Sequence, residues 1–216
     1  MSFKGAIFDV DGVLIDTAYI HFLSWREVFK KYNINFTFND FKSKIDGLPR
    51  ERGIIKILPN ISDKEVKKIA KEKQKYFIYF LNKNKVKKIK GAKKILFLLK
   101  KSKIKLAIAS SSKNAKINLL KSGFYHFFDI DAKGSEIKRG KPHPDIFLKA
   151  AKLLKLKPKE CIVFEDAQAG VDAAKNAGMK CIGIVKGKNK LKNADMIIRD
   201  FSRITIKKIN DLFERK

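Results

Sequence analysis

The sequence predicts an α/β protein with a doubly wound, Rossmann-like parallel sheet and an all-helical domain inserted after the first strand. Two observations predict this class. From Gly91 onward, short apolar runs alternate with amphipathic segments, which is typical of the strand and helix units of a parallel sheet. One further apolar run, Ala6–Val10, precedes a long stretch, 17–82, in which no segment has the pattern of a strand. Helices therefore separate the first strand from the rest of its sheet.

A chain of 216 residues is long enough for one ordinary domain together with a small insert. Its composition, with 44% hydrophobic residues and 17 Phe, is typical of a globular protein. We expect a core domain made of residues 1–15 and 90–216 and a helical cap domain at 16–89. The two junctions between them, near Asp16 and near 87–91, are the expected hinges of a lid.

No apolar run reaches the roughly 18 residues that a membrane span needs, and the first strand follows the N-terminus without a signal-peptide pattern. We therefore expect a cytoplasmic protein with no membrane partner.

Cys161 and Cys181 each begin an apolar run, which favours buried thiols in a reducing compartment over a disulfide or a metal pair. A monomer is the default expectation.

The net charge of +28 raises the question of nucleic-acid binding, since clustered cations attract phosphate backbones. Only seven of the 50 basic residues are Arg, however, and the lysines are spread along nearly every expected helix without a nucleic-acid-binding motif. No specific nucleic-acid partner is expected. A diffuse positive field would still attract an anionic small molecule such as a sugar phosphate.

The insert is expected to contain four helices, at 17–33, 38–45, 51–58 and 62–82. In the first of them Phe22, Trp25 and Val28 recur at helical spacing, and Asp16 or Thr17 is placed to cap the helix.

The core domain is expected to continue with alternating helices and strands, several of the helices ending at a glycine. The expected helices are 92–102, 113–122, 144–155, 167–177 and 204–214, and the expected strands are 105–110, 128–131, 161–164, 180–185 and 196–198. Ligands of such sheets bind outside the carboxyl ends of the strands, so the residues after each strand are the candidates for a site.

Two carboxylates and a glycine follow the first strand. If the strand period of two continues, Asp9 and Asp11 point to the same side, and Gly12 permits a tight departure. Close carboxylates repel each other unless a cation lies between them or one is protonated, so the pair indicates a site. A solvated acidic turn is the alternative.

Three later segments also place polar groups after strands. Ser110-Ser111-Ser112-Lys113-Asn114 is expected to present hydroxyls and free N–H groups at a helix N-terminus, although a serine-rich cap would have the same sequence. Lys141 lies in a loop stiffened by two prolines. Glu165 and Asp166 end a buried strand, where carboxylates from two strands suit Mg²⁺; Asp166 as a helix N-cap is the alternative.

These four segments, in this order, resemble the four motifs of the haloacid dehalogenase-like superfamily over nearly the whole chain; the first motif is Asp9 to Thr17, D-V-D-G-V-L-I-D-T. The resemblance implies phosphoryl transfer in which Asp9 becomes an aspartyl phosphate. Asp11 would be the general acid and base and would ligate Mg²⁺ through its carbonyl group. Ser110 and Lys141 would hold the phosphoryl oxygens, and Glu165 and Asp166 would complete the metal site with Asp9.

Further residues resemble the β-phosphoglucomutase family, which interconverts β-glucose 1-phosphate and glucose 6-phosphate through β-glucose 1,6-bisphosphate. The implied substrate-binding and phosphate-binding residues are Thr17, His21, Trp25, Gly47, Arg50, Lys73, Ser110, Ser111, Ser112, Lys113, Asn114 and Lys141. Arg50 has the chemistry that a mutase needs. A bisphosphate intermediate requires a second anion site far from Asp9, and a guanidinium binds phosphate in a bidentate manner. Gly53 and Gln74 depart from the family pattern, which usually has serine and asparagine there.

Simpler interpretations remain for the insert: Trp25 as a packing residue, His21 as an exposed helix histidine and Lys73 as a solvated lysine. At the level of function, a sugar-phosphate phosphatase of the same fold is the first alternative to the mutase. A basic protein that uses an inactive fold to contact nucleic acid is the second. The intact set Asp9, Asp11, Lys141, Glu165 and Asp166 argues against it, because such a protein has no use for acids gathered at one edge.

Overall fold

The computed structural model describes residues 3–186 and 190–214, and the chain divides into two compact units. The sheet unit consists of Met1–Asp16 with Lys87–Lys216, and the helical unit is Thr17–Val86. The expected boundaries, 1–15 with 90–216 and 16–89, differ slightly, because β2 (Ile15–Asp16) and β3 (Lys87–Lys88) pair with each other in the sheet unit. These two-residue strands are antiparallel and too short to give a periodic sequence pattern.

The main sheet is parallel and six-stranded, with the order β5-β4-β1-β6-β7-β8. Its strands are β1 (Gly5–Phe8), β4 (Lys105–Ile108), β5 (Ile130–Asp131), β6 (Cys161–Glu165), β7 (Lys180–Ile184) and β8 (Met196–Ile198). Phe8 at the end of β1 is in register with Ile108 of β4 and Phe164 of β6, so β1 and β4 end at the same level and β6 continues for one more residue. The predicted doubly wound α/β fold is confirmed.

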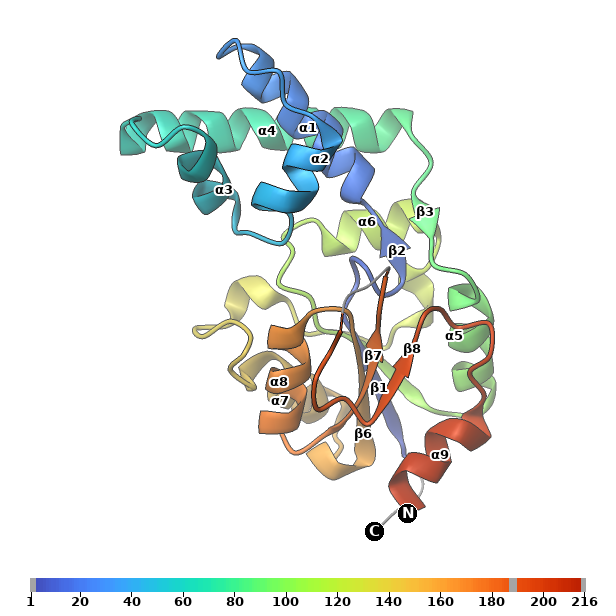
Figure 1. Ribbon diagram of the computed structural model, residues 1–216. Coiled ribbons are helices and arrows are strands. Elements are labelled where there is room, and N and C mark those ends of the chain that lie inside the picture. Colours follow the sequence, from blue (N-terminus) through green and yellow to red (C-terminus); the bar gives the residue numbers. More distant parts are fainter. Residues whose placement is uncertain (1–2, 187–189, 215–216) are drawn as a thin grey trace. The chain divides into compact units, whose positions relative to one another are not determined.

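Helices cover both faces of this sheet (Figure 1). They are α5 (Ala92–Lys101), α6 (Ala115–Ser122), α7 (Asp145–Leu154), α8 (Gln168–Asn176) and α9 (Ile206–Glu214). Ile7 and Val163 belong to the core that packs on α7 and α8. Their neighbours Phe8 and Phe164 stack on each other at 4.4 Å and meet Phe201, because successive strand side chains point to opposite faces.

The helical unit has its own core of buried aromatic and aliphatic side chains. It contains α1 (Ala18–Lys30), α2 (Phe38–Asp40) continued by a π-helical turn (Phe41–Ile45), α3 (Arg50–Ile57) and α4 (Asp63–Lys83). A capping box of Ser62 and Glu65 fixes the start of α4, where each side chain bonds the backbone N–H of the other. Among the described residues, no helix is both long enough and apolar enough to span a membrane.

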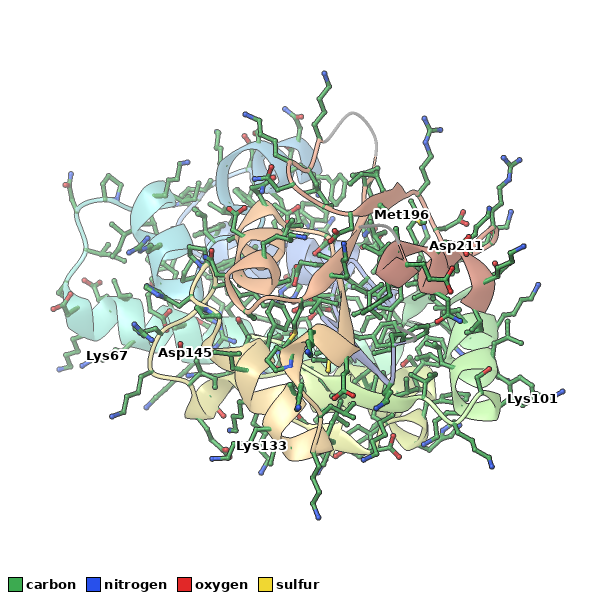
Figure 2. All side chains as sticks on the ribbon, turned by 90° about the horizontal axis from the view of Figure 1, so that it is seen from below. Lys67, Lys101, Lys133, Asp145, Met196 and Asp211 are labelled. Carbon is green, nitrogen blue, oxygen red and sulfur yellow. The ribbon has the colours of Figure 1, made fainter. Side chains whose placement is uncertain are left out.

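Lysines lie on helices of both units rather than along one stripe. In Figure 2, side chains that end in nitrogen project from many elements, with Lys67 on α4, Lys101 on α5 and Lys133 in a loop labelled among them.

The structure corrects three of the expected boundaries next to the site. β1 ends at Phe8 instead of Val10 because the chain turns back after Asp9, and the Gly12 N–H donates to the Ile15 carbonyl at 2.7 Å. β4 ends at Ile108, short of Ser110. α6 begins at Ala115, not at 113, because serine hydroxyls in the preceding loop bind backbone N–H groups there.

Candidate active site

Three carboxylates converge at the carboxyl ends of β1 and β6. Asp9, Glu165 and Asp166 each offer an oxygen atom, and these atoms all lie within 4.8 Å of one another. Asp9 follows β1 directly, and its N–H still donates to the Phe164 carbonyl at 3.0 Å, so the sheet itself holds Asp9 beside Glu165. The convergence of Glu165 and Asp166 on Asp9, expected from the strand ends, is present.

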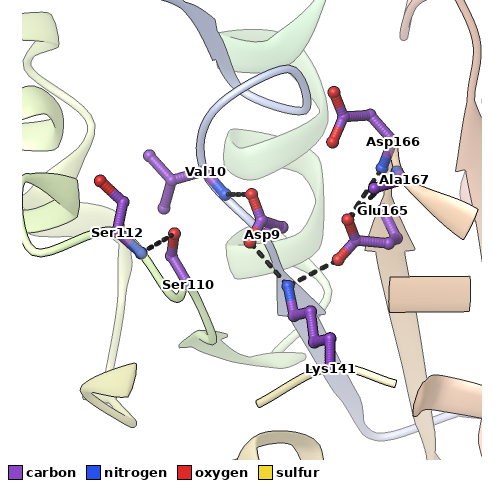
Figure 3. A network of polar contacts seen from close by, with 8 residues as sticks. All are labelled: Asp9, Val10, Ser110, Ser112, Lys141, Glu165, Asp166 and Ala167. Carbon is purple, nitrogen blue, oxygen red and sulfur yellow. Dashed lines mark hydrogen bonds and ion pairs between the residues drawn. The ribbon is translucent and has the colours of Figure 1, made fainter. Parts of the chain in front are cut away.

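Lys141 joins two of these acids. Its Nζ lies 2.7 Å from Asp9 Oδ1 and 2.7 Å from Glu165 Oε2, and its side chain is 11% exposed (Figure 3). Burial alone would lower the pKa of the ammonium group, but the charges of Asp9 and Glu165 raise it above its usual value. Lys141 is therefore a fixed positive charge beside Asp9.

Lys141 supplies one positive charge to a group of three carboxyl groups, Asp9, Glu165 and Asp166. Burial, followed by the charges of Glu165 and Asp9, raises the pKa of Asp166 to about 8. Burial likewise raises the pKa of Glu165, with Asp9 adding to the effect and Lys141 opposing it. Three oxygen donors of this kind, sharing one compensating cation, fit a hard divalent ion such as Mg²⁺.

The side chains of Asp166 and Glu165 occupy space that a Cβ atom at Gly12 or Gly170 would fill. A Cβ atom at Gly12, where φ is +84°, would lie 1.7 Å from Asp166 Oδ2. At Gly170, in the first turn of α8, it would lie 2.1 Å from the carboxyl carbon of Glu165. The Glu165 carboxylate fills this space and accepts from the N–H groups of Asp166 and Ala167, at 3.2 and 3.3 Å. Sequence analysis gave Gly12 only the role of permitting a tight turn and did not single out Gly170.

The Asp11 carboxylate is not one of the three that lie within 4.8 Å of one another. Instead, Asn118 of α6 donates a hydrogen bond from Nδ2 to Asp11 Oδ1 at 3.3 Å. Sequence analysis did not single out Asn118.

The serine loop, residues 110–114, follows β4. The buried Ser110 accepts at Oγ from the Ser112 N–H at 3.3 Å, and Ser112 accepts at Oγ from the Asn114 N–H at 3.2 Å. Two of the N–H groups that were expected to be free therefore bind hydroxyls of the loop itself. Figure 3 draws Ser110 and Ser112 on the other side of Asp9 from Asp166.

Not every residue of this loop has the same surroundings. Asn114 is buried, whereas Ser111 and Lys113 are exposed. A Cβ atom at Gly134 would lie 2.4 Å from the Ser110 carbonyl oxygen, so the backbone of residue 134 packs directly on the loop.

In the helical unit, Lys73 is 2% exposed and is not the solvated lysine of the simpler interpretation. Its Nζ lies 2.6 Å from His21 Nδ1 and over the rings of Trp25 and Phe77, at 5.2 and 4.9 Å. Burial, then the charges of Lys73 and Arg50, hold the pKa of His21 well below its usual value. A neutral His21 can accept a hydrogen bond from the Lys73 ammonium.

Arg50 begins α3 and contacts α4. Its guanidinium donates to Gln74 Oε1 at 2.6 Å and to the Ala70 carbonyl at 3.2 Å, and burial lowers its pKa. Trp25 is 5% exposed and stacks on Phe29, so it packs into the core of the unit.

Thr17, Gly47 and Gly53 of the helical unit differ in their exposure to solvent. Thr17 is buried just before α1, and Gly47 lies in an exposed loop with φ +79°. Gly53 is buried, and a Cβ atom there would meet Trp25 and Ile45 at an ordinary 3.6 Å.

A model of the haloacid dehalogenase-like hydrolase family matches residues 6–184, which contain all of the acids above. The chain belongs to this family. Among its relatives, the beta-phosphoglucomutase of Bacillus subtilis strain 168 is 32% identical over 219 residues, covering 98% of this chain and 96% of that protein. The phosphorylated carbohydrates phosphatase of Thermotoga maritima is 33% identical over 194 residues, covering 86% of this chain and 87% of that protein.

Solved structures of haloacid dehalogenase-like proteins agree with the fold. The crystal structure of beta-phosphoglucomutase from Clostridium difficile has a TM-score of 0.85 and 32% sequence identity to this chain. The match covers 98% of this chain and 97% of that one. The chain is thus similar, over almost its entire length, to enzymes named as mutases and over slightly less of it to one named as a phosphatase.

Proposed function

We propose that the chain is a Mg²⁺-dependent phosphotransferase that interconverts β-glucose 1-phosphate and glucose 6-phosphate through an aspartyl phosphate on Asp9. The observation that carries the proposal is the convergence of Asp9, Lys141, Glu165 and Asp166 at one edge of the sheet. A haloacid dehalogenase-like chain with this group of residues has the chemistry that phosphoryl transfer requires.

In the proposed reaction, an Asp9 carboxylate oxygen attacks phosphorus while the bond from phosphorus to the sugar oxygen breaks. Asp11 gives its proton to that leaving oxygen, and then takes a proton from the hydroxyl that attacks the aspartyl phosphate in the second half-reaction. Lys141 Nζ, 2.7 Å from Asp9 Oδ1, offsets the charge of the incoming phosphate. When bound by Asp9, Glu165 and Asp166, Mg²⁺ would supply further neutralisation of the phosphoryl oxygens.

The choice of a sugar hydroxyl as acceptor is supported by the cations of the helical unit. A mutase must hold a sugar with phosphates at two ends, whereas hydrolysis of a monoester needs a single anion site. Arg50 and Lys73 offer two positive charges, one half-buried and one buried, of the kind that bind phosphate and sugar oxygens. The similarity to the Bacillus beta-phosphoglucomutase over 98% of the chain supports the same choice.

A sugar-phosphate phosphatase is the second candidate. The similarity to the Thermotoga phosphatase favours it, because the same residues hydrolyse a phosphate ester when water replaces the sugar hydroxyl. The two candidates differ only in the acceptor of the phosphoryl group.

The decisive experiment follows β-glucose 1-phosphate by phosphorus NMR, with Mg²⁺ and a trace of β-glucose 1,6-bisphosphate. We expect glucose 6-phosphate to accumulate and inorganic phosphate to stay at background. Asp9→Asn should abolish the reaction, because an amide cannot act as the nucleophile. Release of inorganic phosphate without glucose 6-phosphate would instead establish the phosphatase, and turnover by Asp9→Asn would contradict both candidates.

A further inference from the structure

Asn118 is a buried polar side chain that the reaction described above does not use. It lies in α6, fully buried beside the buried Leu119. Its Nδ2 donates to Asp11 Oδ1 at 3.3 Å, and among the described residues its own Oδ1 has no hydrogen-bond partner.

This arrangement is unfavourable for folding alone. A buried carbonyl oxygen without a partner costs free energy, and an apolar side chain of similar size would remove that cost. Leucine is also a better helix former than asparagine. A residue that weakens its own helix and aims a donor at Asp11 is therefore more easily explained by the site than by the core.

We propose that Asn118 is a positioning residue that fixes the Asp11 carboxyl group for proton transfer, an inference that rests on the proposed phosphotransferase function. Asp11 lies on the turn after β1, where its backbone forms an isolated bridge with Ile15. The hydrogen bond from Asn118 holds one carboxyl oxygen and so restricts rotation of the group. Proton delivery to the sugar oxygen depends on that orientation, whereas attack by Asp9 on phosphorus does not.

Because only proton delivery depends on Asp11, the effect of Asn118 should differ between leaving groups that need a proton and those that do not. A sugar oxygen must receive a proton as its bond to phosphorus breaks, while p-nitrophenolate is stable without one. Removing the Asn118 amide should therefore slow phosphorylation of Asp9 by a sugar phosphate and leave phosphorylation by p-nitrophenyl phosphate almost unchanged. A general loss of packing would slow both reactions alike.

The test is rapid-quench measurement of the first turnover with Mg²⁺, for the wild type and Asn118→Leu, using β-glucose 1,6-bisphosphate and p-nitrophenyl phosphate as donors. We expect Asn118→Leu to lose about tenfold or more in the sugar reaction, as a small misplacement of a reacting group does. The p-nitrophenol burst should stay within about twofold, and the melting temperature should be equal to or above that of the wild type.

Ser122→Ala is the matched control, since Ser122 is buried on the same helix and donates to the Leu119 carbonyl. It should alter neither burst. Equal losses with both donors, or no loss with either, would overturn the role of Asn118 while leaving the phosphotransferase intact. A wild type that reacts with neither donor would overturn the proposed function itself. If Asn118→Leu does not fold, Asn118→Ala is subjected to the same comparison.

Discussion

The Lys141 ammonium group lies between two carboxylates that would otherwise repel each other in a buried place. Lys141→Met keeps the length of the side chain but leaves Asp9 and Glu165 without their cation. We expect the free energy of unfolding in EDTA to fall by about 3 kcal/mol, the usual cost of breaking a buried ion pair on one side. Phosphorylation of Asp9 should fall by about 10² to 10³. Urea unfolding and single-turnover kinetics measure the two effects.

Lys149→Met is the control for Lys141→Met. Lys149 pairs with Glu136 at 2.6 Å, but the side chains are 27% and 54% exposed. Solvent screens such a surface pair, so the control should lose little stability and no activity. If both variants lost stability equally, the burial of the Lys141 ion pairs would not explain the loss.

Gly170 provides a test of the proposed metal site that leaves all three carboxylates in the sequence. In Gly170→Ala, the new methyl group would meet the carboxyl group of Glu165 and push it from its position beside Asp9. We expect Mg²⁺ affinity, measured by calorimetry, to fall by about 10- to 100-fold, as for other changes that displace a ligand. Gly140→Ala is the control, because a Cβ atom at Gly140 meets nothing within 4 Å. Unchanged affinity in Gly170→Ala would argue against Glu165 as a ligand.

Helices α1 and α4 enclose a cation between aromatic rings. Lys73 of α4 lies between Trp25 and Phe77 and contacts His21 of α1. In Lys73→Met one of the charges that hold the pKa of His21 down is gone, so this pKa should rise part of the way toward its usual value, with burial still lowering it. An NMR titration of His21 measures the change.

Lys75→Met is the matched variant for this measurement, because Lys75 is exposed on the same helix. It should leave the His21 titration unaltered. A His21 pKa that does not move in Lys73→Met would contradict the close contact between the two side chains.

The strands were predictable from sequence because each buried strand is a short apolar run that ends abruptly in polar residues. Asp9 after β1 and Glu165 at the end of β6 could therefore be placed at one edge of the sheet. The hydrogen-bond partner of Asp11 could not, because it depends on a turn whose geometry no periodicity encodes. The burial of Lys73 was equally hidden, since one lysine in a chain with 50 basic residues resembles the others.

Tertiary contacts of small or polar residues were also beyond the sequence. Gly12 and Gly170 look like ordinary turn and helix glycines until the carboxylates beside them are placed. Asn118 looks like one polar residue on an amphipathic helix, and only the meeting of α6 with the turn after β1 relates it to Asp11.

The excess of buried acid in the site links the stability of the whole protein to pH and to metal. Because the folded-state pKa of Asp166 is raised to about 8, the folded protein binds a proton that the unfolded chain has released above its ordinary pKa of about 4. The free energy of unfolding should therefore fall as pH rises from about 4 to about 8 in metal-free buffer.

Melting temperatures in EDTA at several pH values test this linkage, with Asp166→Asn as the comparison. The fall between mildly acidic and mildly alkaline pH should be smaller in Asp166→Asn, which has no proton to lose at that position. Mg²⁺ competes with the same proton, so its affinity should rise with pH and its addition should flatten the wild-type curve. An identical slope for both proteins would refute the assignment to Asp166.

The paired strands β2 and β3 bring the entry and exit of the helical unit together at one point of the chain's path. Because Asp16 and Lys87 are paired, a tight turn between them could replace the whole helical unit and would close an ordinary β-hairpin. Exchange of this block for another would leave Asp9 and its acidic neighbours in place. A single contiguous replacement could then change the residues of the helical unit without altering the strand ends of the sheet unit.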